Sequence, residues 1–229
     1  MQTFRCSTQF ILDRLAEMDA RHRRWQRERI QNSNYSGSWT DLMWASLGDG
    51  TAVANTGAET SMLAGLSGNE QPIIPALHFC GQKAVGKSVR FEACGLFSNT
   101  LTPTMQFFGR ISSTVGTGTL SGAVWGQSKA NATASGVSNQ LWWGQLNAVC
   151  RTPGIGSAQA ILACDGWICS PGFATAGFLP MEVSAPDTAS HTVGIDGSVQ
   201  NYLNWSLVWG TASASNTATL IRAMLFGLN

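Results

Sequence analysis

Alternation of apolar and polar residues is the main pattern of this chain. Between residues 86 and 113, Val89, Phe91 and Ala93 alternate with more polar neighbours, and a second run of the same kind begins at Met105. A period of two residues is the signature of a strand with one buried face. Because a short polar segment separates the two runs, we expect them to pair as an antiparallel hairpin. A lone hairpin is not stable in water, so the rest of the chain must cover its apolar face.

Further short runs of β type follow one another along the chain, with glycine, proline and polar turn residues between them. The segment 180–187 is expected to be a long connection. Many short strands without interleaved helices predict a mainly β protein, an antiparallel β-sandwich or jelly roll. The expected strands span residues 39–46, 51–55, 60–64, 73–79, 85–97, 104–113, 119–126, 140–151, 157–164, 191–195, 202–210 and 217–226.

The N-terminal segment has a helical pattern instead. From residue 10 to residue 31, apolar residues recur at spacings of three and four, and the second half of the segment is strongly basic. Such a helix packs on its own domain or on a neighbour, self-associates as a short coiled coil, or contacts nucleic acid. Its arginines are spread around the helix, which argues against nucleic-acid binding. We expect partner contacts through Ile11, Leu15, Met18, Arg21, Arg24 and Trp25.

A polar, glycine-containing linker at residues 32–38 follows this helix. The sequence therefore predicts an N-terminal α-helical arm with its linker in residues 1–38, and a β body in residues 39–229.

The composition narrows the choice of function. Only 12% of the residues are charged, about half the usual share, and the net charge is +1. A neutral surface of small residues suits a protein that packs against other subunits. No apolar run approaches the roughly 20 residues of a membrane-spanning helix, so no membrane partner is expected. The six cysteines are expected to be reduced thiols in the core.

One motif suggests an enzyme. Residues 81–88 match the phosphate-loop pattern GxxxxGK[ST], and Asp165 ends an apolar run as a magnesium-binding carboxylate would. A phosphate loop must open a helix, however, whereas Ser88 is followed by a strand pattern. Lys87 is therefore interpreted as an exposed residue at the start of a strand. We expect no catalytic residue, no cofactor and no metal, since no GxSxG motif or close set of Cys and His ligands occurs.

Nine tryptophans need an explanation as well. Trp142 and Trp143 are adjacent in a strand and must point to opposite faces, so at least one is expected at a surface or subunit interface. Both are therefore included among the expected partner-binding residues. The alternative is a platform on which sugar rings stack, built from members of the set Trp125, Trp142, Trp143, Trp167, Trp205 and Trp209.

Short motifs in the body resemble those of a group of bacteriophage virion proteins. In that group a glutamate-threonine strand, a proline-containing strand, a VGK strand start and a TPT turn follow one another. The matching segments here are residues 56–63, 74–76, 85–95, 102–105 and 225–229, so the resemblance covers about residues 40–229. The basic N-terminal helix departs from the pattern, which leaves the point of attachment open.

The resemblance implies a jelly-roll or β-sandwich component of the virion, such as a capsid decoration (cement) protein. The expected function is thus to stabilise a phage head as a homotrimer that contacts the major capsid protein or other virion subunits. The protein would be made in the host cytoplasm and lie on the head surface. The alternatives are a tail, baseplate or fibre component, and a glycan-binding β-sandwich module.

Overall fold

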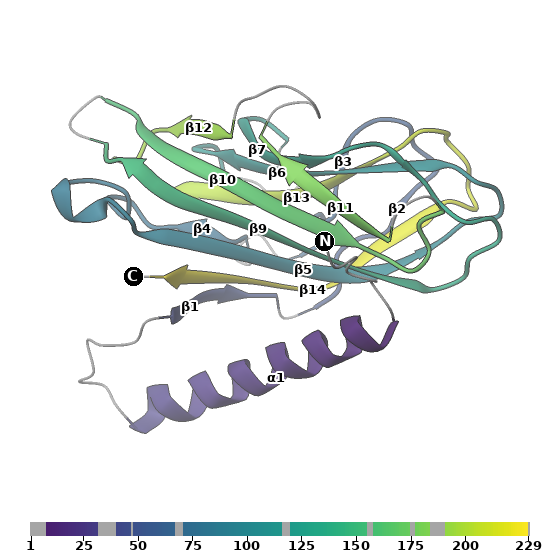
Figure 1. Ribbon diagram of the computed structural model, residues 1–229, viewed down its shortest axis with the longest axis horizontal. Coiled ribbons are helices and arrows are strands. Elements are labelled where there is room, and N and C mark those ends of the chain that lie inside the picture. Colours follow the sequence, from purple (N-terminus) through teal and green to yellow (C-terminus); the bar gives the residue numbers. More distant parts are fainter. Residues whose placement is uncertain are drawn as a thin grey trace, which may run out of the picture.

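The computed structural model describes residues 8–31, 40–46, 48–66, 71–115, 120–154, 158–174, 177–183 and 191–228. Most of these residues lie in strands, and one α-helix precedes them (Figure 1). The predicted fold class, an antiparallel β-sandwich with an N-terminal helix, is confirmed. The elements are α1 (Thr8–Gln31), β1 (Thr40–Ala45), β2 (Val53–Ala54), β3 (Thr60–Ser61), β4 (Ile73–Ile74), the 3-10 helix η1 (Gln82–Ala84), β5 (Ser88–Ser98), β6 (Thr104–Ser112), β7 (Ala123–Ser128), β8 (Asn131–Ala132), β9 (Gln140–Thr152), β10 (Ala160–Cys169), β11 (Phe178–Glu182), β12 (Thr192–Ile195), β13 (Asn201–Trp209) and β14 (Thr217–Leu228).

All strand pairs are antiparallel, and the strands follow the order β1-β14-β5-β9-β10-β11-β7-β6-β13-β3. The strands β1, β14, β5, β9 and β10 form the first layer of the sandwich. β11 pairs with both β10 and β7, and through β7 it joins this layer to the second, formed by β7, β6, β13 and β3. The core lies between the two layers, with α1 on the outer side of the first layer (Figure 1).

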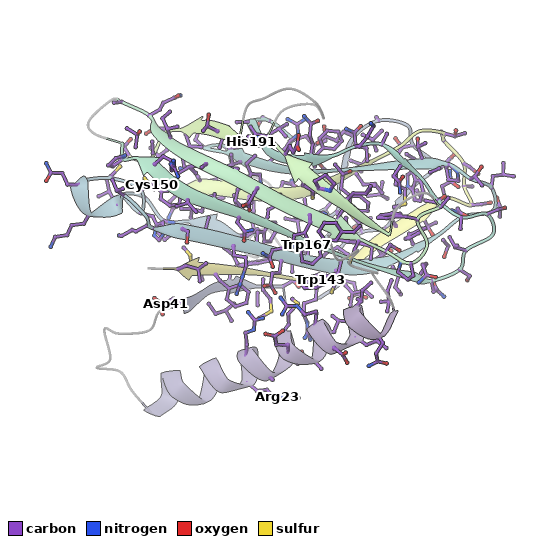
Figure 2. The ribbon with its side chains drawn as sticks, in the orientation of Figure 1. Arg23, Asp41, Trp143, Cys150, Trp167 and His191 are labelled. Carbon is purple, nitrogen blue, oxygen red and sulfur yellow. The ribbon has the colours of Figure 1, made fainter. Side chains whose placement is uncertain are left out.

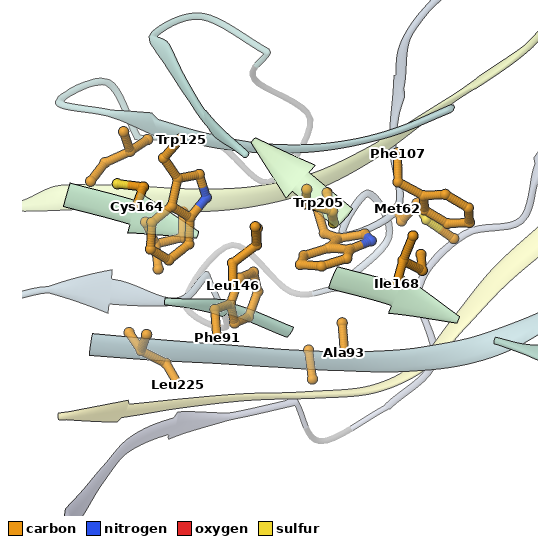
Figure 3. Packing of buried hydrophobic residues seen from close by; sticks show 14 of the residues in the cluster. Met62, Phe91, Ala93, Phe107, Trp125, Leu146, Cys164, Ile168, Trp205 and Leu225 are labelled. Atoms are coloured by element: carbon orange, nitrogen blue, oxygen red, sulfur yellow. The ribbon is translucent and has the colours of Figure 1, made fainter. Parts of the chain in front are cut away.

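The core is rich in aromatic rings that reach across from both layers (Figure 3). Phe91 of β5 lies edge-on to Trp205 of β13, with ring centroids 5.8 Å apart, and Trp142 of β9 stacks on Trp205 at 6.2 Å. These residues occupy alternate positions of their strands, so the period-two pattern of the sequence places them on the inner face. Burial of such large rings supplies much of the apolar area that stabilises the fold.

The prediction that the two strands between residues 86 and 113 pair with each other as a hairpin is wrong. Both strands exist, as β5 and β6, but β5 pairs with β14 and β9, whereas β6 pairs with β13, β7 and β8. The connection crosses from the first layer to the second. Buried Asn99 fixes this crossing, because its side chain donates to Thr133 Oγ1 at 2.6 Å and accepts from the Val137 amide at 3.3 Å.

Two strands were not expected, β8 and β11. β11 includes Pro180, which the sequence suggested as the start of a long connection. Of the rest of that connection, Val183 follows β11 directly, and residues 184–187 lie outside the described residues. Proline cannot donate to a ladder and is tolerated where one side of the strand has no partner. That condition holds here, because β7 pairs only with Met181 and Glu182 of β11.

Candidate functional site

Helix α1 covers part of the outer face of the first layer (Figure 2). Ile11 is fully buried and packs with Cys94 of β5 and with Trp143 and Cys169 of β9 and β10. Two helical turns further along, Met18 packs with Met224 and Phe226 of β14. The helix that was expected from the sequence is present, and its apolar stripe is used within the chain.

Charged groups line the same contact. Glu92 of β5 is fully buried, with Arg90 Nε at 3.0 Å and Arg21 Nη1 of α1 at 3.8 Å from its Oε1. The Arg14 guanidinium lies 4.7 Å from the centre of the Trp143 ring, which adds a cation–π contact. Asp19 forms an ion pair with Arg222 of β14. The underside of α1 is thus matched to the sheet by charge as well as by apolar packing.

Of the helix residues that were expected to bind a partner, four contact the chain's own sheet. Ile11, Leu15, Met18 and Arg21 face the sheet of the same chain, while the side chains of Arg24 and Trp25 lie outside the described residues, as does the predicted linker 32–38.

Trp142 and Trp143 point to opposite faces, as alternation requires, but both are buried. Trp142 lies in the core and Trp143 lies beneath α1. At least one of the two was expected at a surface or subunit interface. Neither is exposed, because α1 covers the outer face of the sheet at Trp143.

Next to α1 a strip of the same outer face remains uncovered. Trp167 of β10 lies edge-on to Trp143, with centroids 4.4 Å apart, and stacks on Phe178 of β11 at 5.4 Å. Figure 2 shows Trp143 and Trp167 together on this side of the sheet. We define the outer strip as Gln145, Asn147, Asp165, Trp167, Phe178 and Pro180.

One end of the sandwich carries exposed apolar side chains on its loops. Leu77 is 63% exposed, Val85 is 59% exposed and Val199 is 39% exposed. Leu77 has a positive φ of 66°, which is unfavourable for leucine, and its amide donates to Gly197 O at 2.8 Å in the loop that carries Val199. We call these three residues the apolar end.

The phosphate-loop pattern does not form a phosphate loop. A phosphate loop needs an α-helix that begins at the Gly-Lys-Ser residues, whereas here Ser88 begins strand β5 and residues 82–84 form only the single turn η1. His78, expected in a strand, lies in the preceding turn, where burial and the nearby charge of Lys87 lower its pKa.

The cysteines of the described residues are all free. Cys94, Cys150, Cys164 and Cys169 are buried, as expected of core residues, whereas Cys80 is half-buried. Burial raises the pKa of Cys94 and Cys164 to about 12, so both thiols are protonated at neutral pH. Cys6 lies outside the described residues.

Among the described residues, no group of His, Cys, Asp and Glu side chains is arranged to hold a metal ion. A helix with the length and apolar character needed to cross a bilayer is also not found in the described part of the chain.

Comparison with known proteins gives little. No family model matches the chain, and no curated protein is similar to it in sequence. Among solved structures, the CBM2 module of the evolved Dit of Lactobacillus casei BL23 phage J-1 is similar over 86% of this chain and 93% of that chain. The identity is 9% and the TM-score is 0.29, a level of likeness from which neither fold nor function is inferred.

Proposed function

We propose that the chain is a non-enzymatic structural protein of a phage virion, a decoration (cement) protein that stabilises the head shell as a homotrimer. The observation that carries this proposal is the apolar end. Exposed large apolar side chains gathered on one part of a surface mark sites of protein contact. Here they occur in a protein with only 12% charged residues, which has little charge to keep copies and partners apart.

The backbone supports the same interpretation. Leucine pays a conformational cost at a φ of 66°, and such strain persists only where the surroundings impose it. The hydrogen bond from the Leu77 amide to Gly197 O and that from Cys80 N to Leu77 O, at 3.1 Å, hold the turn. The result is a backbone turn that is held in place and that carries a leucine side chain 63% exposed to solvent. An apolar side chain on a fixed turn loses less entropy on binding than one on a mobile loop, which favours contact with a shell subunit.

Many copies of one small contact would account for the stabilising function. A decoration protein adds buried area across the joints between shell subunits and so opposes the pressure of packaged DNA. Each contact is small, and many copies of the same contact, with three per trimer, give strong overall binding. The expected partner is the major capsid protein, and neither a membrane nor nucleic acid is needed.

Co-sedimentation with phage heads assembled without this protein tests the proposal. The full chain is expected to bind, and Leu77→Asp is expected to weaken binding by at least about tenfold, since a charge would be buried in the contact. Leu101→Asp is the matched control, because Leu101 is 71% exposed and lies in the loop between β5 and β6 at the opposite end.

A chain that does not sediment with heads, or that binds equally well with Asp at position 77, contradicts the proposal.

The alternative is a tail, baseplate or fibre component, which would use the same kind of contact. Gold-labelled antibodies on intact virions distinguish the two, since they mark heads in one case and tails in the other.

A further inference from the structure

The outer strip combines aromatic rings with side-chain amides and a carboxylate on one face of the sheet. Across β9 and β10, Trp167 lies opposite Gln145 and Asp165 lies opposite Asn147. On the other side of β10, Pro180 lies opposite Trp167, and Phe178 lies opposite Cys169. From Phe178 to Asp165 the strip spans four residues along β10, a length of about 13 Å. Three consecutive strands thus build one continuous surface.

The polar side of the strip is already ordered. Gln145 Nε2 donates to Asn147 Oδ1 at 3.0 Å, and Asn147 Nδ2 donates to Asp165 Oδ1 at 2.7 Å. A primary amide has two donors and an acceptor with two lone pairs, and a carboxylate accepts several hydrogen bonds. These three side chains therefore keep donors and acceptors for a ligand while they fix one another in place.

The aromatic side is ordered as well. Trp167 is held between Phe178, which is inclined to it by 25°, and Trp143, which stands at 90°. Trp143 is itself fixed by Ile11 of α1 and by the Arg14 guanidinium. Phe178 is the outer member of this stack and is 38% exposed. A ring backed in this way is a rigid platform, which loses little entropy when a ligand stacks on it.

We propose that the outer strip is a binding site for a neutral glycan. A pyranose ring has an apolar C–H face, which stacks on an aromatic ring, and a rim of hydroxyl groups, which suit amide and carboxylate partners. The strip offers both on one face of the sheet. Exposed Asp165 and half-buried Glu182 beside it oppose an anionic polymer such as nucleic acid. The centre of a protein–protein contact is depleted of charge, which makes a protein partner fit less well here.

This site goes beyond the proposed function and does not depend on it. The strip lies on the outer face of the first layer, whereas the apolar end lies on the loops before β5 and before β13, at one end of the sandwich. A virion protein with both surfaces would bind a shell through one and a cell-surface glycan through the other. Shell binding and glycan binding are therefore expected to fail separately when each surface is altered.

Isothermal titration of the full chain with neutral hexasaccharides tests the site, with cellohexaose, laminarihexaose and chitohexaose as probes. Binding of at least one probe is expected. Phe178→Ala and Asp165→Ala should each weaken it by about tenfold or more, since they remove the platform or a hydrogen-bond acceptor. Both positions are exposed, so the fold should persist, which circular dichroism checks. Phe108→Ala is the control, because Phe108 is half-buried on the outer face of the second layer.

The proposal is overturned if none of the three probes binds, or if binding is unchanged in both strip variants. A third outcome also overturns it. If Phe178→Ala does not change the affinity for any glycan but reduces co-sedimentation with heads, the strip is a protein contact. Loss of head binding in Leu77→Asp with unchanged glycan affinity would support both surfaces as described.

Discussion

At the scale of single residues, the core depends on placing glycines next to tryptophans. A Cβ atom added to Gly144 of β9 would lie 2.7 Å from Trp205 Cζ2, and one added to Gly109 of β6 would lie 2.4 Å from Trp125 Nε1. Real Cβ atoms do not approach heavy atoms so closely. The indole rings fit between the layers only because a strand that they contact, β9 for Trp205 and β6 for Trp125, lacks a side chain at that point. This is close packing by alternation of large and small residues.

Gly144→Ala is therefore expected to lower the free energy of unfolding by about 1–3 kcal/mol, the usual cost of overpacking a core. The Trp205 ring is fully buried and packs against Phe91 and Trp142, so it cannot shift without displacing these rings. Urea denaturation followed by tryptophan fluorescence measures the change. Gly48→Ala is the matched control, since a Cβ at Gly48 meets nothing within 4 Å. Equal stability of the two variants would contradict this account of the core.

Glu59, part of the glutamate-threonine motif, has an electrostatic role. Its carboxylate accepts two hydrogen bonds from Arg110 of β6, at 2.6 and 2.5 Å, and one from Ser206 of β13. Burial alone would raise the pKa of Glu59, but these hydrogen bonds and the Arg110 charge outweigh it and lower the pKa. The motif thus fastens the segment before β3 to two strands of the second layer.

A carboxyl group whose pKa is lower in the folded chain stabilises the fold fully above its unfolded pKa, here 4.5. That contribution is lost as the pH falls from there through the lower folded pKa. We expect the free energy of unfolding to fall between pH 6 and pH 3, and to fall less in Glu59→Gln, which has no proton to bind. Urea titrations at both pH values measure the difference. A variant with the same pH dependence as the unchanged chain would refute the role given to Glu59, and exposed Asp49→Asn serves as the control.

At the scale of elements, α1 is attached to the body by few side chains. Ile11 and Met18 are buried against the sheet, whereas Leu12, the neighbour of Ile11, is 45% exposed. Ile11→Asp would place a charge on Cys94 and Trp143 and is expected to detach the first turns of the helix. Leu12→Asp also replaces an aliphatic side chain with a carboxylate, one residue away, but on the exposed side of the helix. It should therefore leave the helix in place.

Thiol labelling measures that detachment. Cys94 and Cys169 lie beneath α1, and burial raises the pKa of Cys94 to about 12, so both should react slowly in the folded chain. We expect Ile11→Asp to speed labelling of these two thiols by about tenfold or more, because helix detachment exposes them to solvent. Mass spectrometry of peptides separates them from Cys6. Equal rates in the Ile11→Asp and Leu12→Asp variants would mean that α1 does not protect this face.

Most strands could be predicted from the sequence, but their partners could not. Alternation tells which residues share a face, and so it located β5 and β6 and placed Trp142 and Trp143 on opposite sides. It does not tell whether a polar segment such as 99–103 closes a hairpin or crosses between layers, because both need turn residues. The outer strip was predicted only in part. Trp143 and Trp167 were candidates for a sugar-stacking platform, and the structure brings these two rings together. The residues around Trp167 were missed, because the strip joins β9, β10 and β11, and Pro180 within β11 suggested a loop.

At the scale of the whole molecule, different surfaces have different chemistry. The outer face of the first layer is shared between α1 and the outer strip, and one end of the sandwich carries Leu77, Val85 and Val199. With 12% charged residues and a net charge of +1, the molecule has weak charge repulsion between copies. Association through apolar side chains should therefore depend little on ionic strength, unlike association through ion pairs.

Light scattering of the full chain is expected to show a trimer that persists in 1 M sodium chloride, where the Debye length is about 3 Å. A monomer at all concentrations would contradict the proposed trimer, and a trimer lost in high salt would assign it to ion pairs. Removal of residues 1–38 is not a neutral test, because it uncovers Trp143, Met224 and Phe226 beneath α1. The truncated chain is expected to form larger aggregates, since a newly exposed apolar face drives non-specific association. A truncated chain that stays a clean trimer would instead show that this face needs no cover and that the β body alone makes the trimer.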